Sequence, residues 1–387
     1  MKTPRPLLLL ALSLALVLGI TACSEMTASP TGGAPTVGAE SPPTTAAAAG
    51  AEGTSTGAVS EAATAAPLTT PGAWTELHPA GDLPSARFDP SMVFELYGGG
   101  VFVFGGCTGG PTGVYLNDTW GYDPVANVWT SLGSTGDAPS VRIGSAMAYG
   151  SGSGQVILFG GDNGNAYFYD TWAYDRKADV WVLPGLVGEQ PLGRSSCLMT
   201  YDSRNDRIIL FGGLSWDTGY INETWAYDPG ANTWTNLNPS GSLPPPRGQG
   251  GMVYDSRSGL VILFGGSNHD AWFNDTWTYD PAANTWTELS PTGDLPTARH
   301  RFGLAYDSGK DRVVLFGGTD VDRNFYNDTW IYDPNANTWT ELIQSGAGPG
   351  ARTGTAMVYD SLSGDLILFG GLGGGSSLND LWAYRLP

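Results

Sequence analysis

The chain has 387 residues, among them 56 glycines, 27 prolines and 14 tryptophans, and only 14% of its residues are charged. Many aromatic and turn-forming residues with few charges are typical of an all-β protein built from short strands. The 18 basic residues stand against 37 acidic ones, a net charge of −19, which argues against nucleic acid as a partner and against attraction to an anionic membrane surface.

Residues 1–22 have the pattern of an export signal. Lys2 and Arg5 precede an apolar run over 7–20, which is short for a membrane-spanning helix and has the proportions of a signal peptide. The run ends in "ITAC", which resembles a bacterial lipobox and predicts a lipid on Cys23; the alternative is an ordinary cleavage site with an incidental cysteine. We expect an exported protein, held at the bacterial membrane by its lipid alone and facing outward or into the periplasm.

Residues 24–72 predict a disordered tether. The segment is rich in Ala, Thr, Pro, Gly and Ser and has no bulky aromatic residue. It cannot bury enough apolar surface to offset the entropy of folding. Cys23 and this tether, over 23–72, therefore connect the membrane to a folded domain at 73–387.

Residues 73–387 contain one pattern repeated six times. A double glycine closes an apolar run in each repeat, and each repeat predicts four short antiparallel strands joined by Asp, Pro, Asn and Gly turns. One tryptophan recurs at a near-constant spacing, as Trp120, Trp172, Trp225, Trp277, Trp330 and Trp382. The second strand, "LVILFGG" at 260–266, is apolar on both faces, so each sheet must lie between two neighbours. Radial stacking in a β-propeller achieves this.

The Gly-Gly pair, the Tyr-Asp pair and the spaced tryptophan of each repeat resemble the kelch repeat. The resemblance covers all of 73–387 and implies an all-β propeller of six blades with four strands each. The last third strand, "DLWAYRLP", ends the chain without a fourth strand behind it. Because "AWTEL" at 73–77 matches the fourth-strand sequence "TWTEL", we expect it to complete the last blade and close the ring. Propellers host unrelated activities, so this resemblance predicts fold more than function.

The repeat also contains four N-glycosylation sequons, at Asn117, Asn222, Asn274 and Asn327. Their recurrence at one position of the blade favours a different role, a hydrogen bond at a turn or strand edge.

In a propeller, the loops from strand two to three and from strand four to the next strand one open on the same face, which we call the loop face. The other hairpins open on the turn face and here have near-uniform sequences. Binding residues are therefore expected on the loop face. One arginine per repeat begins the innermost strand there: Arg87, Arg142, Arg194, Arg247, Arg299 and Arg352. The kelch resemblance implies that such arginines can bind acidic peptides or small anions; alternatively, each bonds the neighbouring blade's carbonyls or an aspartate and locks the ring.

The loops after the glycine pairs differ from blade to blade and combine aromatic with polar side chains, which suits sugars or protein loops. The remaining candidate binding residues are Trp216, Tyr220, His269, Trp272, His300 and Arg323. Phe168, Phe273 and Tyr326, by contrast, are expected to pack into their own blades. We predict a monomeric binding or scaffold module for a protein or glycan partner at the cell envelope.

An enzyme is the alternative. Galactose oxidase has a similar fold, but its copper site uses two tyrosines, two histidines and a cross-linked cysteine. His269 and His300, on adjacent blades, have no clear third ligand, so no metal or cofactor is predicted. A sialic-acid mutarotase, which by family resemblance is also a six-bladed kelch protein, would need a glutamate base near an arginine. Glu189, ahead of Arg194, is the single candidate for that catalytic role.

Overall fold

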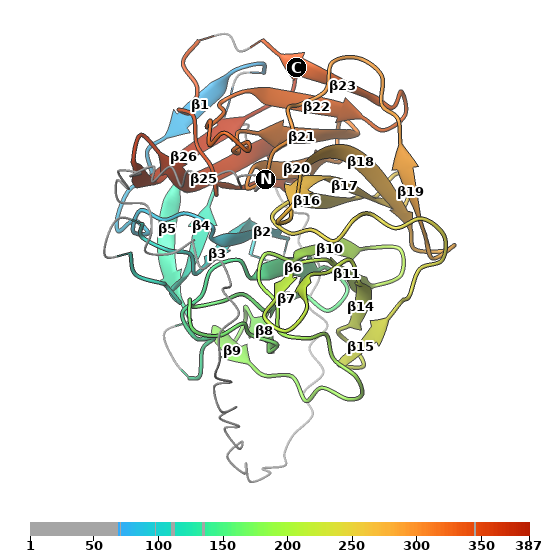
Figure 1. Ribbon diagram of the computed structural model, residues 1–387. Coiled ribbons are helices and arrows are strands. Elements are labelled where there is room, and N and C mark those ends of the chain that lie inside the picture. The colour runs from blue at the N-terminus through green and yellow to red at the C-terminus, as the bar shows by residue number, and fades with distance from the viewer. Residues whose placement is uncertain (1–68, 70, 97, 110–112, 134–135, 344–345) are drawn as a thin grey trace, which may run out of the picture.

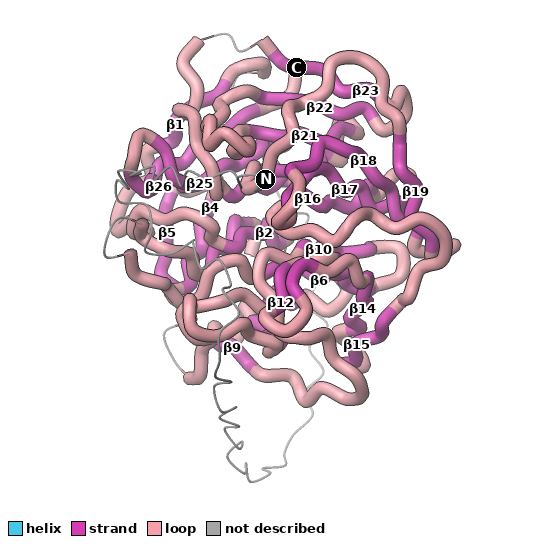
Figure 2. Tube along the Cα trace, in the orientation of Figure 1, coloured by secondary structure: helices cyan, strands magenta, loops and turns pink. Residues whose placement is uncertain are grey.

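The computed structural model describes residues 69, 71–96, 98–109, 113–133, 136–343 and 346–387. The predicted signal peptide, Cys23 and nearly all of the tether lie outside these residues. Within the described ranges the chain alternates strands with loops and contains no helix (Figure 2). It follows that no helix in this part of the chain is long and apolar enough to cross a membrane.

Six four-stranded antiparallel sheets surround a common centre, which confirms the six-bladed propeller predicted from the repeats (Figure 1). The innermost strands contact their neighbours around the ring. They are β2 (Ser91–Glu95), β6 (Ala146–Gly150), β10 (Leu198–Asp202), β16 (Gly251–Asp255), β20 (Gly303–Asp307) and β24 (Ala356–Asp360). The second strands are β3 (Gly100–Phe104), β7 (Gln155–Phe159), β11 (Arg207–Phe211), β17 (Leu260–Ser267), β21 (Arg312–Phe316) and β25 (Asp365–Gly373).

The third and fourth strands form the outer half of each blade. The third strands are β4 (Thr119–Asp123), β8 (Thr171–Asp175), β14 (Thr224–Asp228), β18 (Trp272–Asp280), β22 (Thr329–Asp333) and β26 (Ser376–Tyr384). The fourth strands are β5 (Val128–Leu132), β9 (Val180–Val182), β15 (Thr233–Asn236), β19 (Thr285–Leu289), β23 (Thr338–Leu342) and β1 (Trp74–Leu77). In the third blade, β12 (Leu214–Ser215) and β13 (Gly219–Tyr220) form a small hairpin that is separate from the four-stranded sheet.

The hydrophobic core lies between the blades. Each large cluster of buried side chains joins two neighbouring sheets; one of them combines Ile157 and Phe159 of β7 with Ile208 and Leu210 of β11. This packing on both faces of the second strands explains why their sequences are continuously apolar.

The first described strand closes the ring. β1 pairs with β26 in antiparallel register, with Trp74 opposite Tyr384 and Leu77 opposite Leu381. The pairing continues through the backbone bond from Gly72 N to Arg385 O at 2.9 Å. The blue β1 lies beside the red β26 in Figure 1. The predicted closure by 73–77 is therefore confirmed, with the strand beginning at Trp74.

The glycine pairs allow one blade to approach the next at backbone distance. Gly105 and Gly106 have φ of 66° and 99°, in the region that favours glycine. The amide of Gly106 donates to the carbonyl of Arg142 in the next blade at 3.0 Å. A Cβ on Gly105 would lie 2.9 Å from the same carbonyl oxygen. A side chain at this position would therefore separate the two blades.

The outer tryptophans connect each blade to the one before it. Trp181 Nε1 in β9 donates to Thr119 Oγ1 in β4 at 2.9 Å, with both residues buried. The same bond joins Trp234 to Thr171, Trp286 to Thr224, Trp339 to Thr276 and Trp74 to Thr329. The joint between the last and first blades differs, because Leu381 stands where the other blades have threonine. Trp129 packs there against Phe369, with ring centroids 5.1 Å apart.

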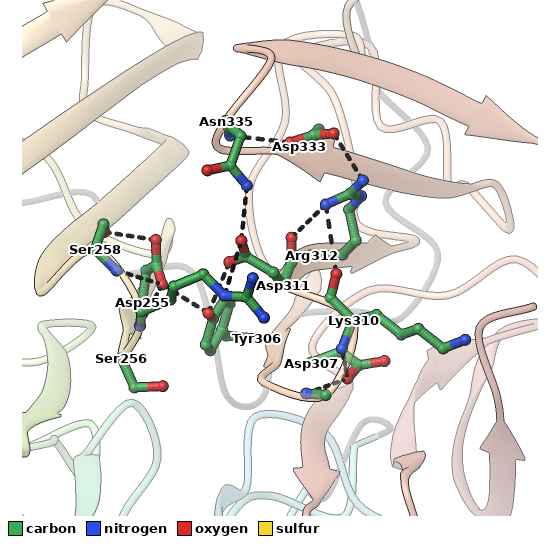
Figure 3. Close-up of polar contacts among 12 residues, drawn as sticks. Asp255, Ser256, Ser258, Tyr306, Asp307, Lys310, Asp311, Arg312, Asp333 and Asn335 are labelled. Atoms are coloured by element: carbon green, nitrogen blue, oxygen red, sulfur yellow. Dashed lines mark hydrogen bonds and ion pairs between the residues drawn. The ribbon is translucent and has the colours of Figure 1, made fainter.

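The turn face is held by buried carboxylates. Figure 3 shows the Tyr306 hydroxyl between Asp255 of the fourth blade and Asp311 of the fifth, at 2.6 and 2.8 Å. Asn335 donates to the second oxygen of Asp311 at 2.7 Å, and Arg312 pairs with Asp333. Burial, together with the two carboxylates, raises the pKa of Tyr306, so its hydroxyl stays protonated and continues to donate.

Candidate binding face

The six repeated arginines are buried in the scaffold beneath the loop face. Arg87 Nη1 donates to the carbonyl of Gly105 at 2.9 Å, and its two Nη atoms hold Asp118 in a bidentate pair at 2.7 Å. The equivalent pairs are Arg142–Asp170, Arg194–Glu223, Arg247–Asp275, Arg299–Asp328 and Arg352–Asp380. All six guanidinium groups are at most 2% exposed. Their geometry agrees with a structural role through the carboxylate, but the carbonyls that each guanidinium bonds belong to its own blade and the loop leading into it, not to the neighbouring blade.

The acidic partner of each arginine is the second residue of the repeated triplet, which reads "NDT" or "NET" in four blades, "YDT" in the second and "NDL" in the sixth. Burial alone would raise the pKa of Asp118, but hydrogen bonding and charge from Arg87 outweigh it and lower that pKa. Phe168, Phe273 and Tyr326 stack on the arginines of their own blades, with the guanidinium of Arg247 3.8 Å from the ring centre of Phe273.

The asparagine of the triplet binds a backbone carbonyl. Asn117 Nδ2 donates to the carbonyl of Pro139, and Asn222 donates to that of Pro244, at 3.2 and 3.0 Å. The threonine of the triplet accepts from the tryptophan of the next blade, as described above. The sequon residues thus perform structural roles, in agreement with the interpretation favoured from their recurrence.

Six residues just ahead of the innermost strands form what we call the backbone hoop: Asp89, Gly144, Ser196, Gln249, Arg301 and Gly354. All six have φ between 50° and 63°. Amide-to-carbonyl bonds of 2.7–3.0 Å link five of the six neighbouring pairs around the axis, for example from Arg301 N to Gln249 O. Main-chain bonds therefore position four different polar residues around the axis.

His300 and Arg301 lie beside each other at this axis. Ser267 Oγ is 2.8 Å from His300 Nδ1, and the rings of His300 and Trp272 have centroids 5.8 Å apart in an edge-to-face arrangement. Burial, assisted by the charge of Arg301, lowers the pKa of His300 to about 3, so the imidazole is neutral at physiological pH. Arg301 pairs with Asp89 at 3.5 Å, a longer distance than in any ring pair.

A collar of side chains surrounds the hoop, one from each blade. Each collar residue pairs across a short hairpin with the residue that follows the glycine pair. The members are Tyr115, Tyr167, Tyr220, Trp272, Phe325 and Ser377. All six are partly exposed, which gives the loop face an aromatic ring broken in the sixth blade.

A hollow of about 580 Å³ opens on the loop face between the second and third blades. Its lining includes Tyr167, Tyr169 and Trp216, and the turn of the β12–β13 hairpin carries Trp216 to its edge. Trp216 and Tyr169 are each 60% exposed. The rings of Tyr167 and Trp216 meet edge to face, with centroids 6.0 Å apart.

The other sequence-predicted residues are spread over the same face. His269 is exposed and its ring contacts that of Tyr220 at 5.0 Å. Arg323 is exposed in a turn closed by the bond from its amide to the carbonyl of Asp320. Glu189 is exposed. Arg194, which follows it in the sequence, is buried and pairs with Glu223 instead. Trp272 and His300 converge, but Arg299 faces the scaffold.

Two polar atoms near His300 are buried with no hydrogen-bond partner among the described residues: Trp272 Nε1 and Thr319 Oγ1. Thr319 pairs with His300 across an antiparallel bridge. Within the same described ranges, no group of three or more His, Cys, Asp or Glu side chains is placed to hold a metal ion.

The hoop and the collar were missed from the sequence, although a signal for the collar is present. An aromatic residue stands three positions ahead of the acidic residue of the triplet in the first five blades, as Tyr115 precedes Asp118. Unequal loop lengths after the glycine pairs hide this register. The hairpin β12–β13 is the third blade's form of this pairing, and its length likewise follows from the loop and not from the repeat.

The fold and the arginine–carboxylate ring define the class of protein: the chain belongs to the kelch-repeat family. The model of the KLHDC2/KLHL20/DRC7 kelch-repeats domain matches it in four overlapping stretches, 53–259, 97–310, 158–360 and 256–387. Among curated relatives, the chain is similar to an N-(sulfonatooxy)prop-2-enimidothioate sulfolyase from Thlaspi arvense. The two are 25% identical over 315 residues, which cover 75% of this chain and 82% of the relative.

Proposed function

We propose that this protein is a binding module whose loop face takes a protein or glycan partner at the cell envelope. The contrast between repeated and unrepeated residues carries the proposal. The side chains of the repeated triplet and the repeated arginines are engaged within the scaffold. Trp216, His269 and Tyr169 are unrepeated and exposed on the loop face. A bulky aromatic residue that the fold does not use, on the rim of a rigid ring, is suited to a partner.

The two unpartnered atoms beside His300 support the same face. Leaving a buried donor or acceptor unsatisfied costs ~1–3 kcal/mol. A ligand or an ordered water that met Trp272 Nε1 or Thr319 Oγ1 would recover that free energy. Recognition on the loop face therefore involves Trp272 as well as Trp216.

The proposal includes a location. We infer that residues 1–22 direct export and that Cys23 carries a lipid, with 24–72 as a leash for the propeller. The support is the lipobox-like "ITAC" after an apolar run. Cys23→Ser should stop incorporation of labelled palmitate and release the protein to the medium or block its processing. Equal labelling of the variant would reject the lipid anchor.

The test of the binding face compares variants of the two faces. The full-length protein is screened against envelope extracts and cell-wall glycans. Trp272→Ala should weaken capture of the partner by about 2 kcal/mol, the size expected for a hot-spot residue, with little change in thermal stability. On the turn face, Asp228 Oδ1 accepts from the amides of Gly230 and Ala231, so Asp228→Ala should lower stability and leave affinity unchanged. Normal folding with lost binding in Asp228→Ala, together with full binding in Trp272→Ala, would mean that the wrong face was chosen.

A second candidate function is an enzyme, and the sulfolyase relative favours it. The name of that relative describes a substrate with an N-linked sulfonatooxy group, which is anionic. Arg301 could receive such a group at the axis, because its side chain is 18% exposed and its pairing with Asp89 is long. Incubation with that substrate should release inorganic sulfate, and Arg301→Gln should abolish the release. If the wild-type protein releases no sulfate, the enzyme proposal is rejected and the binding module remains.

A further inference from the structure

The hollow between the second and third blades lies where the repeat pattern is interrupted. Five blades begin the triplet with asparagine, but the second blade has Tyr169. Where the asparagine is present, as in Asn117, Asn222 and Asn274, its amide donates to a proline carbonyl 22 residues further on. The proline at that spacing from Tyr169 is Pro191, and both residues line the hollow. The cavity therefore opens at the position of a missing asparagine–proline bond.

The lining provides flat aromatic surface. Tyr169 and Trp216 are each 60% exposed, and Leu192 beside them is 47% exposed. The exposed part of these rings gives no stability to the fold, since that apolar area remains in contact with water. A volume of about 580 Å³ lies within the ~300–1,000 Å³ typical of sites for small ligands.

The polar groups of the lining are unengaged. Among the described residues, the side chains of Gln190 and Asp217 form no hydrogen bond within the chain, and both are exposed. A carboxylate only accepts hydrogen bonds, whereas a carboxamide both donates and accepts. A ligand that satisfies both must present several donors as well as acceptors. Hydroxyl groups of a sugar do so, whereas the proline residues of a proline-rich peptide have no N–H to donate.

The charges around the hollow select against an acidic ligand. Asp217 is the charged member of its lining, Glu189 is exposed next to Gln190, and no Lys, Arg or His lines it. Burial raises the pKa of Tyr167 to about 12, so this hydroxyl is neutral and can donate. An anion would meet two carboxylates here without a compensating cation.

We propose that this hollow, formed by Tyr167, Tyr169, Gln190, Trp216 and Asp217, binds a saccharide that carries no negative charge. The sugar ring stacks on Trp216 or Tyr169, while Gln190 and Asp217 bind its hydroxyl groups. This inference rests on the proposed function and specifies the ligand class for one part of the loop face.

The experiment uses the full-length protein and isothermal titration calorimetry. The probes are neutral oligosaccharides of glucose and of N-acetylglucosamine, with oligogalacturonate as the acidic counterpart and a proline-rich peptide as the competing class. A neutral oligosaccharide should bind, and oligogalacturonate should bind at least tenfold more weakly. Trp216→Ala should weaken binding at least tenfold, and Asp217→Asn should narrow the difference between neutral and acidic sugars.

The matched variant is Tyr169→Asn, which restores the residue of the other blades. It should bond the carbonyl of Pro191, raise the melting temperature or leave it unchanged, and lose the sugar. Loss of binding can then not be assigned to unfolding.

The outcomes separate this inference from the proposed function. Binding of neutral sugars that survives both Trp216→Ala and Tyr169→Asn overturns the site. A preference for the peptide or for oligogalacturonate, or no sugar binding at all, overturns the ligand class, and the loop-face proposal still stands if Trp272→Ala weakens capture of an envelope partner. If only Asp228→Ala on the turn face affects binding, both proposals fail together.

Discussion

The turn face and the loop face of this propeller connect the same strands, but the turns are nearly uniform from blade to blade and the loops are not. On the turn face, aspartates accept the same two turn amides in blade after blade, as Asp280 does from Ala282 and Ala283. On the loop face, the hairpin after the glycine pair differs in length from blade to blade, the third blade exposes Trp216 in its turn, and the second replaces the asparagine of the triplet by Tyr169. In a repeat protein, a residue present in every copy reports on packing, whereas a departure in one copy needs an explanation outside the repeat.

Removal of residues 73–77 should have the largest effect of all. The deletion exposes the edge of β26 and removes Trp74, which is 5% exposed and bonded to Thr329. Loss of a buried tryptophan alone costs ~3–5 kcal/mol. Thermal unfolding should therefore shift downward far more than after deletion of residues 30–60. Equal melting temperatures for the two truncations would contradict closure of the ring by β1.

Substitution of one of the six repeated arginines should have the second-largest effect on stability. Arg247→Met leaves the Asp275 carboxylate without its guanidinium partner and should cost ~3–5 kcal/mol in the free energy of unfolding, as measured by urea denaturation. Arg247→Met combined with Asp275→Leu should recover part of that loss, because no unpaired charge is left. If the single variant unfolds like the wild type, the arginine is not a structural residue.

His300 should make stability depend on pH. Its folded pKa of about 3 lies below its usual value of 6.5, so the unfolded chain binds a proton that the folded chain excludes between these values. Protonation of His300 does not affect the free energy of unfolding above pH 6.5, and this free energy falls as the pH drops from 6.5 toward 3. Between pH 7.5 and 5, wild type should lose about 2 kcal/mol more than His300→Asn. Parallel pH profiles for the two proteins would show that the imidazole is not held neutral.

The smallest effect concerns a single joint between blades. Thr224→Val removes the hydroxyl that accepts from Trp286 Nε1 at 2.9 Å and should cost ~1–2 kcal/mol. A double-mutant cycle with Trp286→Phe isolates the bond from the change in packing. A coupling energy near zero would show that these joints are held by ring packing alone.

The fold could be predicted almost completely from the sequence because six copies of one pattern average out local ambiguity. Strand ends were the exception. β17 ends at Ser267, one residue beyond the predicted end at Gly266, because the short loop that follows lets the hairpin continue through the pair of Ser267 with Trp272. Pairing of this kind depends on loop length, which the strand pattern does not contain.

The candidate site could be predicted only in part. Trp216, Tyr220, His269, Trp272 and His300 were found as unrepeated residues, and the structure places them on the loop face. The hollow was not found, because it depends on Tyr169 and Gln190 meeting Trp216 across two blades. Arg301 was overlooked beside the repeated Arg299, because its exposure and partners follow from the left-handed backbone at the axis.

The hydrogen bonds of the backbone hoop do not depend on which side chains its residues carry. Its bonds run from amide to carbonyl, so Asp89, Ser196, Gln249 and Arg301 contribute nothing to them that glycine does not also contribute at Gly144 and Gly354. The cost of a left-handed conformation at a non-glycine residue is modest, ~1–2 kcal/mol per position. Charge, size and polarity can therefore change at the four hoop positions that carry side chains without loss of these bonds, whereas a Cβ at Gly144 or Gly354 would lie only 2.4 Å from Ser195 Oγ or 2.6 Å from Asp89 Oδ1.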